Sequence, residues 1–125
     1  MTRHTIFALL VASMTSATAF AQGTGAPAEI KLGTLYASSG RFASISMPVH
    51  DGLKLWLEQK NAEGGVFVKA FNKKIPLKLI AYDDQSNTAT AATLYNQLIT
   101  QDKVDILVSD SGSVLTSVAL SLIHI

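Results

Sequence analysis

Three short apolar segments, each followed by a helical pattern, restrict the fold of this chain more than any other feature. Residues 29–36, 77–82 and 104–109 have the length of β-strands and end in small or acidic polar residues. The third segment is almost continuously apolar, which is typical of a parallel strand covered on both faces. Strands that alternate with helices predict right-handed crossovers. The sequence therefore predicts an α/β fold with a parallel, doubly wound sheet.

The first helix is expected over residues 46–61. Ser46 can cap it, and Pro48 is tolerated in its first turn. Gly64 and Gly65 end it. The residues expected on its buried face share the 3.6-residue helical spacing, and they are Ile45, Val49, Leu53, Trp56 and Leu57.

A small hairpin arm is expected over residues 66–74. The second helix should open at residues 86–88, which are Ser, Asn and Thr, all favourable caps, and the third near Ser113. The strand order two-one-three, as in flavodoxin-like sheets, would open a crevice between the carboxyl ends of strands one and three. The loops at that crevice are residues 37–43 and 110–113.

The amino terminus has the three parts of a cleavable export signal, predicted over residues 1–21. Arg3 and His4 provide a basic start, and a compact apolar stretch follows. Ala19 and Ala21 are small residues at the two positions that a signal peptidase reads. We therefore expect cleavage before Gln22.

The alternative interpretation of this segment is a membrane anchor. Its apolar run is well below the roughly 20 residues that span a bilayer, so a cleaved signal is favoured. Residues 22–28 are small and rich in Gly, Ala and Pro, and they are expected to form a flexible leader. The mature protein is therefore expected outside the cytoplasm, in the periplasm.

Charge excludes two classes of partner. Only Arg3 among ten Lys and Arg residues lies in the signal, which leaves nine basic against nine acidic residues. There is no basic stripe for nucleic acid and no polybasic cluster for anionic lipid. Lys73 and Lys74 are the densest basic spot and are expected at a solvated hairpin tip. We therefore expect no nucleic-acid partner.

Enzyme signatures are missing: the chain has no Gly-x-Ser-x-Gly, no phosphate loop and no dinucleotide fingerprint. Asp83 and Asp84 are adjacent carboxylates, which point in different directions and are expected to interact with the next helix N-terminus rather than with a metal. His50 has no positioned serine or cysteine for a triad. Trp56 and Tyr95 have the spacing of core residues. No enzyme activity, cofactor or metal is therefore expected.

Several short motifs occur in an order that resembles a known family. An Asn-x-x-Gly-Gly sequence follows the first helix, and a hairpin and an apolar strand ending in Asp-Asp come next. The set resembles the amino-terminal part of periplasmic solute-binding proteins of the branched-chain amino acid (Leu/Ile/Val) type, which serve ABC importers. The matching stretches are residues 30–33, 39–40, 51–52, 61–66, 82–86 and 109–113.

The resemblance implies two α/β lobes joined by a hinge, with ligand bound in the cleft between them. Residues 29–119 would then form an incomplete first lobe of the type I periplasmic-binding fold. The implied function is an extracytoplasmic, non-enzymatic receptor that captures an amino acid, or a related small carboxylate or amide. Its implied partner is an ABC permease in the membrane.

The resemblance also implies which residues hold the ligand. Hydroxyls and N–H groups of Ser111, Gly112 and Ser113 would bind its carboxylate, since the start of a helix attracts anions. Ser39, Gly40 and either Ile45 or Phe42 would line the cleft. Branched-chain binders often carry an aromatic residue near Ile45, so the exact ligand stays open. The alternative for both loops is an ordinary turn or helix cap.

Two other functions stay open from the sequence: a sensor domain of the same fold, and a secreted doubly wound enzyme whose catalytic residues lie beyond this stretch. Residues 120–125 resemble the translated end of a transposon adapter used in sequencing libraries. They are therefore expected to be a non-native tail on a fragment. Such a fragment lacks the opposing wall of the cleft and is expected to bind its ligand weakly or not at all.

Overall fold

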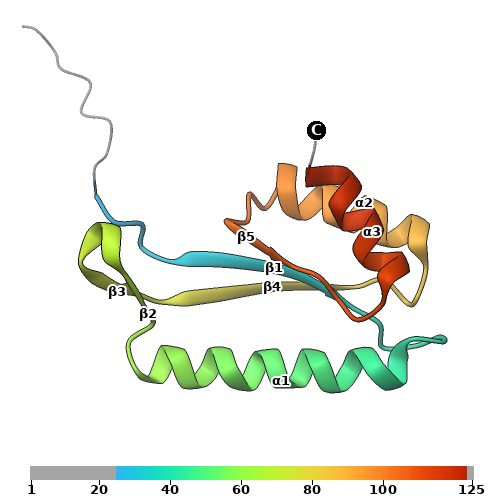
Figure 1. The fold of residues 1–125 in the computed structure, drawn as a ribbon, viewed down its shortest axis with the longest axis horizontal. Helices are drawn as coiled ribbons and strands as arrows, with labels where there is room; N and C mark the ends of the chain where they lie inside the picture. Colours follow the sequence, from blue (N-terminus) through green and yellow to red (C-terminus); the bar gives the residue numbers. More distant parts are fainter. Residues whose placement is uncertain (1–24, 124–125) are drawn as a thin grey trace, which may run out of the picture.

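A computed structural model describes residues 25–123 as a small parallel sheet between two layers of helices (Figure 1). Helix α1 covers one face of the sheet, and helices α2 and α3 cover the other face. The expected cleavage residues Ala19, Ala21 and Gln22 lie outside the described residues, so the export signal stays a prediction.

The elements follow the predicted alternation of strands and helices. The parallel strands are β1 (Ile30–Tyr36), β4 (Leu77–Asp83) and β5 (Ile106–Val108). The helices are α1 (Ala43–Ala62), α2 (Thr88–Thr100) and α3 (Ser113–Ile123). Between α1 and β4 lie β2 (Val66–Val68), the 3₁₀ turn η1 (Lys69–Phe71) and β3 (Lys73–Ile75).

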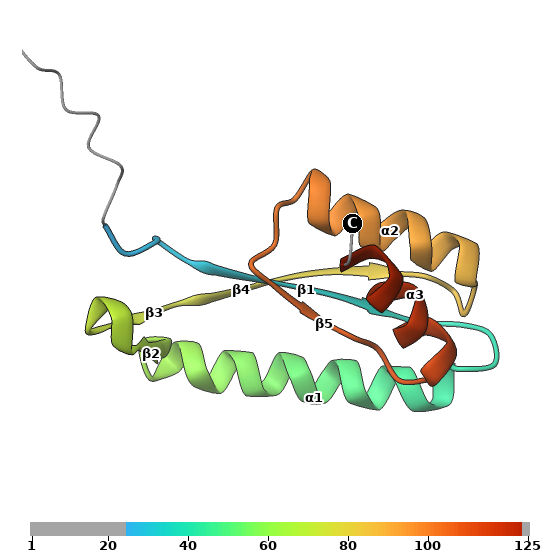
Figure 2. The ribbon, with the colours of Figure 1, turned by 45° about the horizontal axis from the view of Figure 1, so that its top comes forward.

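The strand order is β4-β1-β5, which confirms the predicted order two-one-three. Both pairings of β1 are parallel, and Leu32 lies opposite Leu79 on one side and Ile106 on the other. The carboxyl ends of the three strands therefore meet at one end of the sheet. Figure 2 shows the loops that lead into α1, α2 and α3 gathered at that end.

The main hydrophobic core lies between the sheet and the α2–α3 layer. Its buried members are Leu35, Ala91, Tyr95, Leu98, Leu115 and Ala119. Gly33 allows α2 and the connection before β5 to approach closely, because a Cβ there would lie 2.9 Å from a Val104 methyl carbon and 3.2 Å from Leu98 Cδ2.

Helix α1 begins three residues earlier than predicted, at Ala43. The prediction that Ser46 caps it was wrong, because Ser46 lies inside the helix and is fully buried. Pro48 consequently lies beyond the first turn. The two glycines do end the helix, as predicted, and Gly64 and Gly65 both have positive φ angles, of 91° and 97°.

The predicted buried face of α1 was partly wrong. Ile45, Val49 and Trp56 are 58%, 51% and 41% exposed, whereas Leu53 and Leu57 are half-buried. The helix packs on β1 and β4, and only the side that faces those strands is covered.

Although α1 has 20 residues, no helix within residues 25–123 is both long and apolar enough to cross a membrane.

Strand β5 is shorter and more exposed than predicted. It has three residues, and Ile106 is 51% exposed although the segment was expected to be covered on both faces. The reason is its position: β5 pairs only with β1 and is an edge strand of the sheet that the structure describes. Apolar composition alone did not reveal this edge position.

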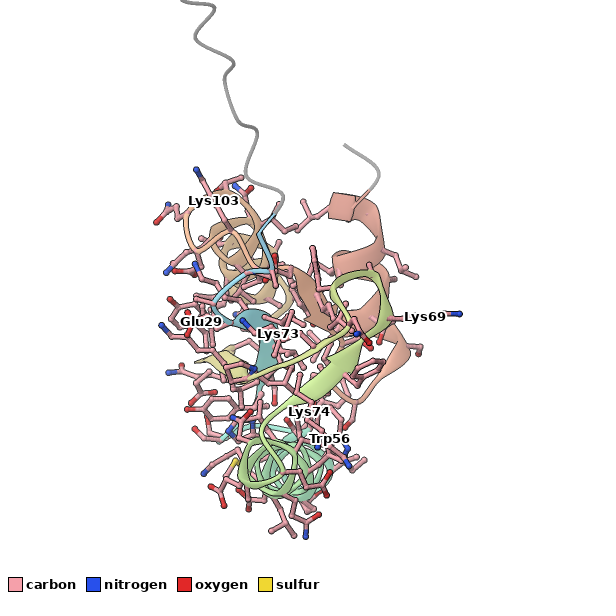
Figure 3. The ribbon with its side chains drawn as sticks, turned by 90° about the vertical axis from the view of Figure 1, so that its left-hand side faces the viewer. Glu29, Trp56, Lys69, Lys73, Lys74 and Lys103 are labelled. Atoms are coloured by element: carbon pink, nitrogen blue, oxygen red, sulfur yellow. The ribbon has the colours of Figure 1, made fainter. Side chains whose placement is uncertain are left out.

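The hairpin of β2 and β3 lies at the end of the sheet opposite the gathered loops. It turns through η1 and Asn72, which adopts a left-handed conformation with φ 48°. Lys73 and Lys74 lie in β3 rather than at the tip, and the Lys74 Nζ donates to the Glu63 carbonyl at 2.7 Å. Figure 3 views this end and shows Lys69 pointing away from the molecule.

Candidate functional site

Three loops at the carboxyl ends of the strands form the candidate site, and we call them the cleft loops. They are the β1–α1 loop (residues 37–42), the β4–α2 loop (residues 84–87) and the β5–α3 loop (residues 109–112). The six residues predicted to bind ligand lie on two of these loops or in the first turns of α1 and α3. The topology therefore brings the predicted residues to one end of the sheet.

A serine on the β4–α2 loop holds the β1–α1 loop in place. The Ser86 hydroxyl donates to the Ser39 carbonyl at 2.7 Å and accepts from the Phe42 N–H at 3.1 Å. Gly40 makes this approach possible, because its φ is +81° and a Cβ there would lie 2.7 Å from the Ser86 Cβ. Sequence reasoning treated Ser86 only as a helix cap and missed this role.

Asp83 also ties the β1–α1 loop to the end of β4. Its carboxylate accepts hydrogen bonds from the Ser38 N–H at 3.0 Å, from the Ser38 hydroxyl, and from the Gln85 N–H at 2.9 Å. Desolvation opposes ionisation of Asp83, but these hydrogen bonds outweigh it and lower its pKa. Asp83 therefore holds the two loops together and does not cap the helix that follows.

The predicted interaction of Asp83 and Asp84 with the α2 N-terminus was wrong. Asn87 caps α2, and its side-chain oxygen accepts from the Ala89 and Thr90 N–H groups at 2.9 and 3.0 Å. The physical reason is that the tight turn after β4 places Asn87, not the acids, directly before the helix. One Asp84 oxygen instead accepts from the Ser86 N–H at 2.8 Å within this turn.

The β5–α3 loop is organised by Asp110, which is only 6% exposed. One carboxylate oxygen accepts from the Ser111 N–H at 2.5 Å, and the other accepts from the Ser46 hydroxyl at 2.7 Å. The Ser111 N–H is therefore already occupied by Asp110. The Ser111 hydroxyl is buried and has no hydrogen-bond partner among the described residues.

The other predicted ligand residues are accessible. Gly112 and Ser113 are exposed at the start of α3, and Gly112 has a φ of +121°. A Cβ on Gly112 would lie 3.8 Å from the Phe42 ring, so the β1–α1 and β5–α3 loops adjoin. Ile45 is exposed in the first turn of α1. These positions therefore present backbone N–H groups, a hydroxyl and an apolar side chain at the same end of the sheet.

The β4–α2 cleft loop itself contains a buried polar group. Asp84 is fully buried, and its second carboxylate oxygen has no hydrogen-bond partner within residues 25–123. Burial raises its pKa, and the charges of Asp110 and Asp83 add to this effect. The hydroxyl of Tyr95 is also buried, and burial raises its pKa more than the nearby Asp110 backbone lowers it. The charges of Asp110 and Asp84 add to the increase.

This arrangement predicts a pH-dependent effect of Asp84→Asn. A raised folded-state pKa means that Asp84 favours folding in its protonated form and opposes folding as the pH rises through that pKa. The free energy of unfolding of the Asp84→Asn variant, relative to wild type, should therefore be higher at pH 7 than at about pH 3.5, below the ordinary pKa of an aspartate. Urea unfolding at the two pH values measures this difference.

The exposed Asp51 in α1 provides the control, since Asp51→Asn removes no buried group and should change the free energy of unfolding at pH 7 by less than about 0.5 kcal/mol. If the free energy of unfolding of Asp84→Asn, relative to wild type, instead decreases from about pH 3.5 to pH 7, then ionised Asp84 does not destabilise the folded chain.

A second concave surface lies away from the predicted ligand residues. It is a groove of about 420 Å³ between α1 and the sheet, lined by Tyr36, His50, Lys54 and Leu57 among others. The Tyr36 and His50 rings stack with centroids 4.3 Å apart. Burial lowers the pKa of His50, and the neighbouring Lys54 adds to this effect. None of the six predicted ligand residues lines this groove.

A family model and several solved structures of solute-binding proteins are similar to this chain. The model of the periplasmic binding protein family matches residues 29–124. A substrate-binding protein of a branched-chain amino acid transporter from Streptococcus pneumoniae, solved in complex with isoleucine, is 29% identical, with a TM-score of 0.66. The alignment covers 74% of this chain and 25% of that chain.

Two further solved structures share the fold at lower identity. A possible leucine/isoleucine/valine-binding protein from Rhodopirellula baltica is 23% identical with a TM-score of 0.65, over 82% of this chain and 26% of that one. An ABC-transporter solute-binding protein from Rhodopseudomonas palustris, in complex with 3,4-dihydroxybenzoic acid, is 21% identical with a TM-score of 0.62, over 77% and 24%.

The chain thus spans about a quarter of the length of these solved relatives. Its β4-β1-β5 parallel sheet carries the cleft loops at the carboxyl ends of the strands. Since the family model matches nearly all of the described chain in addition, this chain belongs to the periplasmic binding protein family.

Proposed function

We propose that this chain is the start of an extracytoplasmic receptor that captures a branched-chain amino acid, or a related small carboxylate or amide, for an ABC importer. The observation that carries the proposal is the exposed start of α3, at Gly112 and Ser113, beside the β1–α1 loop. Two solved relatives hold isoleucine and a dihydroxybenzoic acid, which both carry a carboxylate. The chemistry common to these ligands matches the chemistry of the loop.

A ligand carboxylate would bind at the start of α3. The helix has 11 residues and no acidic residue in its first turn, so its N-terminal dipole attracts an anion without repulsion from that turn. The Gly112 N–H, together with the N–H and hydroxyl of Ser113, would donate to the carboxylate. The exposed Ile45 would contact the apolar part of the ligand.

The proposed receptor has two lobes, and residues 29–119 form part of the first. Residues 1–21 would be the export signal, 22–28 the leader and 120–125 a non-native tail, although α3 continues to Ile123. Closure of the second lobe over the ligand would be the state that the permease recognises. The 125-residue chain alone is then expected to bind weakly, because one lobe offers only one wall.

The first test is to sequence the source locus outward past codon 119 and to express any longer reading frame. Calorimetry of that product against isoleucine, leucine, valine and benzoate should give a one-to-one complex with at least one of them. A frame that ends after codon 125 would contradict the proposal. A complete two-lobe product that binds none of these ligands would also contradict it. Tight stoichiometric binding by the 125-residue chain would contradict the two-lobe mechanism.

The predicted role of the serines is tested by the Ser111→Ala, Ser113→Ala double variant of the complete receptor. Loss of hydrogen bonds to a charged carboxylate should weaken binding by about 1–3 kcal/mol. Single variants separate the exposed Ser113 hydroxyl from the buried Ser111 hydroxyl.

The matched control is Ser117→Ala, since the exposed Ser117 hydroxyl bonds to the Val114 carbonyl of its own helix. Its dissociation constant should equal that of wild type. Unchanged affinity in the double variant would remove both predicted serines from the binding site.

A further inference from the structure

We infer that Ser46 and Asp110 are positioning residues that couple the two ligand-binding loops of the proposed receptor. Neither was predicted to contact ligand, and neither is exposed: Ser46 is fully buried and Asp110 is 6% exposed. The inference rests on the proposed function, since it assigns these residues to the geometry of that same site.

The Ser46 hydroxyl bridges two segments that are distant in sequence. It accepts from the Ala37 N–H at 2.8 Å, where the β1–α1 loop leaves β1, and it donates to an Asp110 carboxylate oxygen at 2.7 Å. The other Asp110 oxygen accepts from the Ser111 N–H. Hydrogen bonds therefore run without a break from Ala37 through Ser46 and Asp110 to Ser111, from one cleft loop to the other.

This series of hydrogen bonds is the side-chain link between the two loops within the described residues. Other side-chain bonds of the β1–α1 loop run to the β4–α2 side instead, through Ser86 and Asp83. Ser46 thus determines how residues 39–45 lie relative to residues 111–113. A ligand that contacts both loops requires this relative position.

The chemistry of the link makes it sensitive to single-atom changes. Ser46→Ala removes the hydroxyl, so the buried Ala37 N–H and one Asp110 oxygen lose their partner. Asp110→Asn keeps the shape but removes the charge. With its oxygen accepting from the Ser111 N–H, its amide group faces the Ser46 hydroxyl, which must then accept instead of donate, so a charge-assisted bond becomes a weaker neutral one. Ser46→Ala therefore breaks the link, and Asp110→Asn weakens it at the same bond.

The test uses calorimetry on the complete receptor, with isoleucine as the probe. Ser46→Ala and Asp110→Asn should each raise the dissociation constant about tenfold to a hundredfold, as for lost hydrogen bonds that involve a charge. The stoichiometry should remain that of wild type. The double variant should bind no more weakly than the weaker-binding single variant, because both changes act on the same link.

Matched controls lie on the same helix. Ser44 is exposed, forms no side-chain hydrogen bond within the described residues, and precedes Ser46 by two positions, while Asp51 is exposed further along α1. Ser44→Ala and Asp51→Asn should leave the dissociation constant unchanged. A lower melting temperature with an unchanged dissociation constant in Ser46→Ala would show a merely structural role and overturn the inference.

A second measurement separates this inference from the proposed function. Amide hydrogen exchange of the 125-residue chain needs no ligand, and Ser46→Ala should accelerate exchange at both Ala37 and Ser111. Acceleration at Ala37 alone would show that the loops are not coupled. If the complete receptor binds none of the ligands tested while both amides respond, the proposed function fails but the coupling of the loops stands.

Discussion

Gly65→Ala should destabilise the chain more than the same substitution at Gly64 or Gly52. Gly65 has a φ of +97°, and a Cβ there would lie 2.1 Å from the Ile75 carbonyl oxygen and 2.3 Å from its carbon. Backbone strain and overpacking together should lower the free energy of unfolding by about 2–5 kcal/mol. Urea unfolding followed by far-ultraviolet circular dichroism measures the loss.

The physical reason is the way in which the end of α1 is held against the start of β4. The Gly65 N–H donates to the Lys60 carbonyl at 2.8 Å, so the chain leaves the helix in a tight left-handed turn. The Asn61 side chain then bonds both the N–H and the carbonyl of Leu77, at 2.8 and 2.7 Å. Any displacement of Gly65 disturbs this junction between helix and sheet.

The other two glycines are graded controls. At Gly64 the nearest atom to a Cβ is 3.7 Å away, so Gly64→Ala adds only the strain of its positive φ, about 1–2 kcal/mol. Gly52 lies inside α1 with open space around it, and Gly52→Ala should raise stability by about 0.5–1 kcal/mol. Equal losses at Gly52 and Gly65 would contradict the steric explanation.

Leu98→Ala should have the second large effect. Leu98 is fully buried in α2, and its Cδ2 lies close against Gly33 of β1, in the layer that also contains Tyr95 and Leu115. Truncation leaves a cavity between the sheet and both helices of this layer. The free energy of unfolding should fall by about 2–5 kcal/mol.

The matched control is Leu55→Ala, because Leu55 is 57% exposed on α1. Its substitution should change stability by less than about 0.5 kcal/mol. The urea midpoint of Leu98→Ala should fall without a change in slope, since the folded state still buries most of the same surface. A loss below about 1 kcal/mol would show that α2 and α3 pack loosely on the sheet.

The fold was largely predictable because its signals are local. Each strand carries its own apolar run, Gly64 and Gly65 mark the end of α1, and Asn87 marks the start of α2. The strand order was assumed by analogy with flavodoxin-like sheets, and it was confirmed as β4-β1-β5. Which residues bind the ligand remains a prediction, although the topology places all six at one end of the sheet.

Predictions from helical spacing failed where burial depends on neighbours. Trp56 has the spacing of a core residue, yet it is 41% exposed because α1 packs on the sheet along only one side. Ile106 belongs to a strongly apolar segment, yet it lies in an edge strand of the described sheet. Periodicity identifies an apolar stripe, but it does not determine which part of that stripe another element covers.

The sequence by itself determined the elements, their order along the chain and the polar loops at the strand ends. Only the tertiary structure decided that Ser46 is an internal link rather than a helix cap. Its partner Asp110 is 64 residues away, and no local pattern identifies a hydrogen bond over that separation. The same holds for Ser86 and Phe42, which are 44 residues apart, because parallel strands bring distant loops to one end of the sheet.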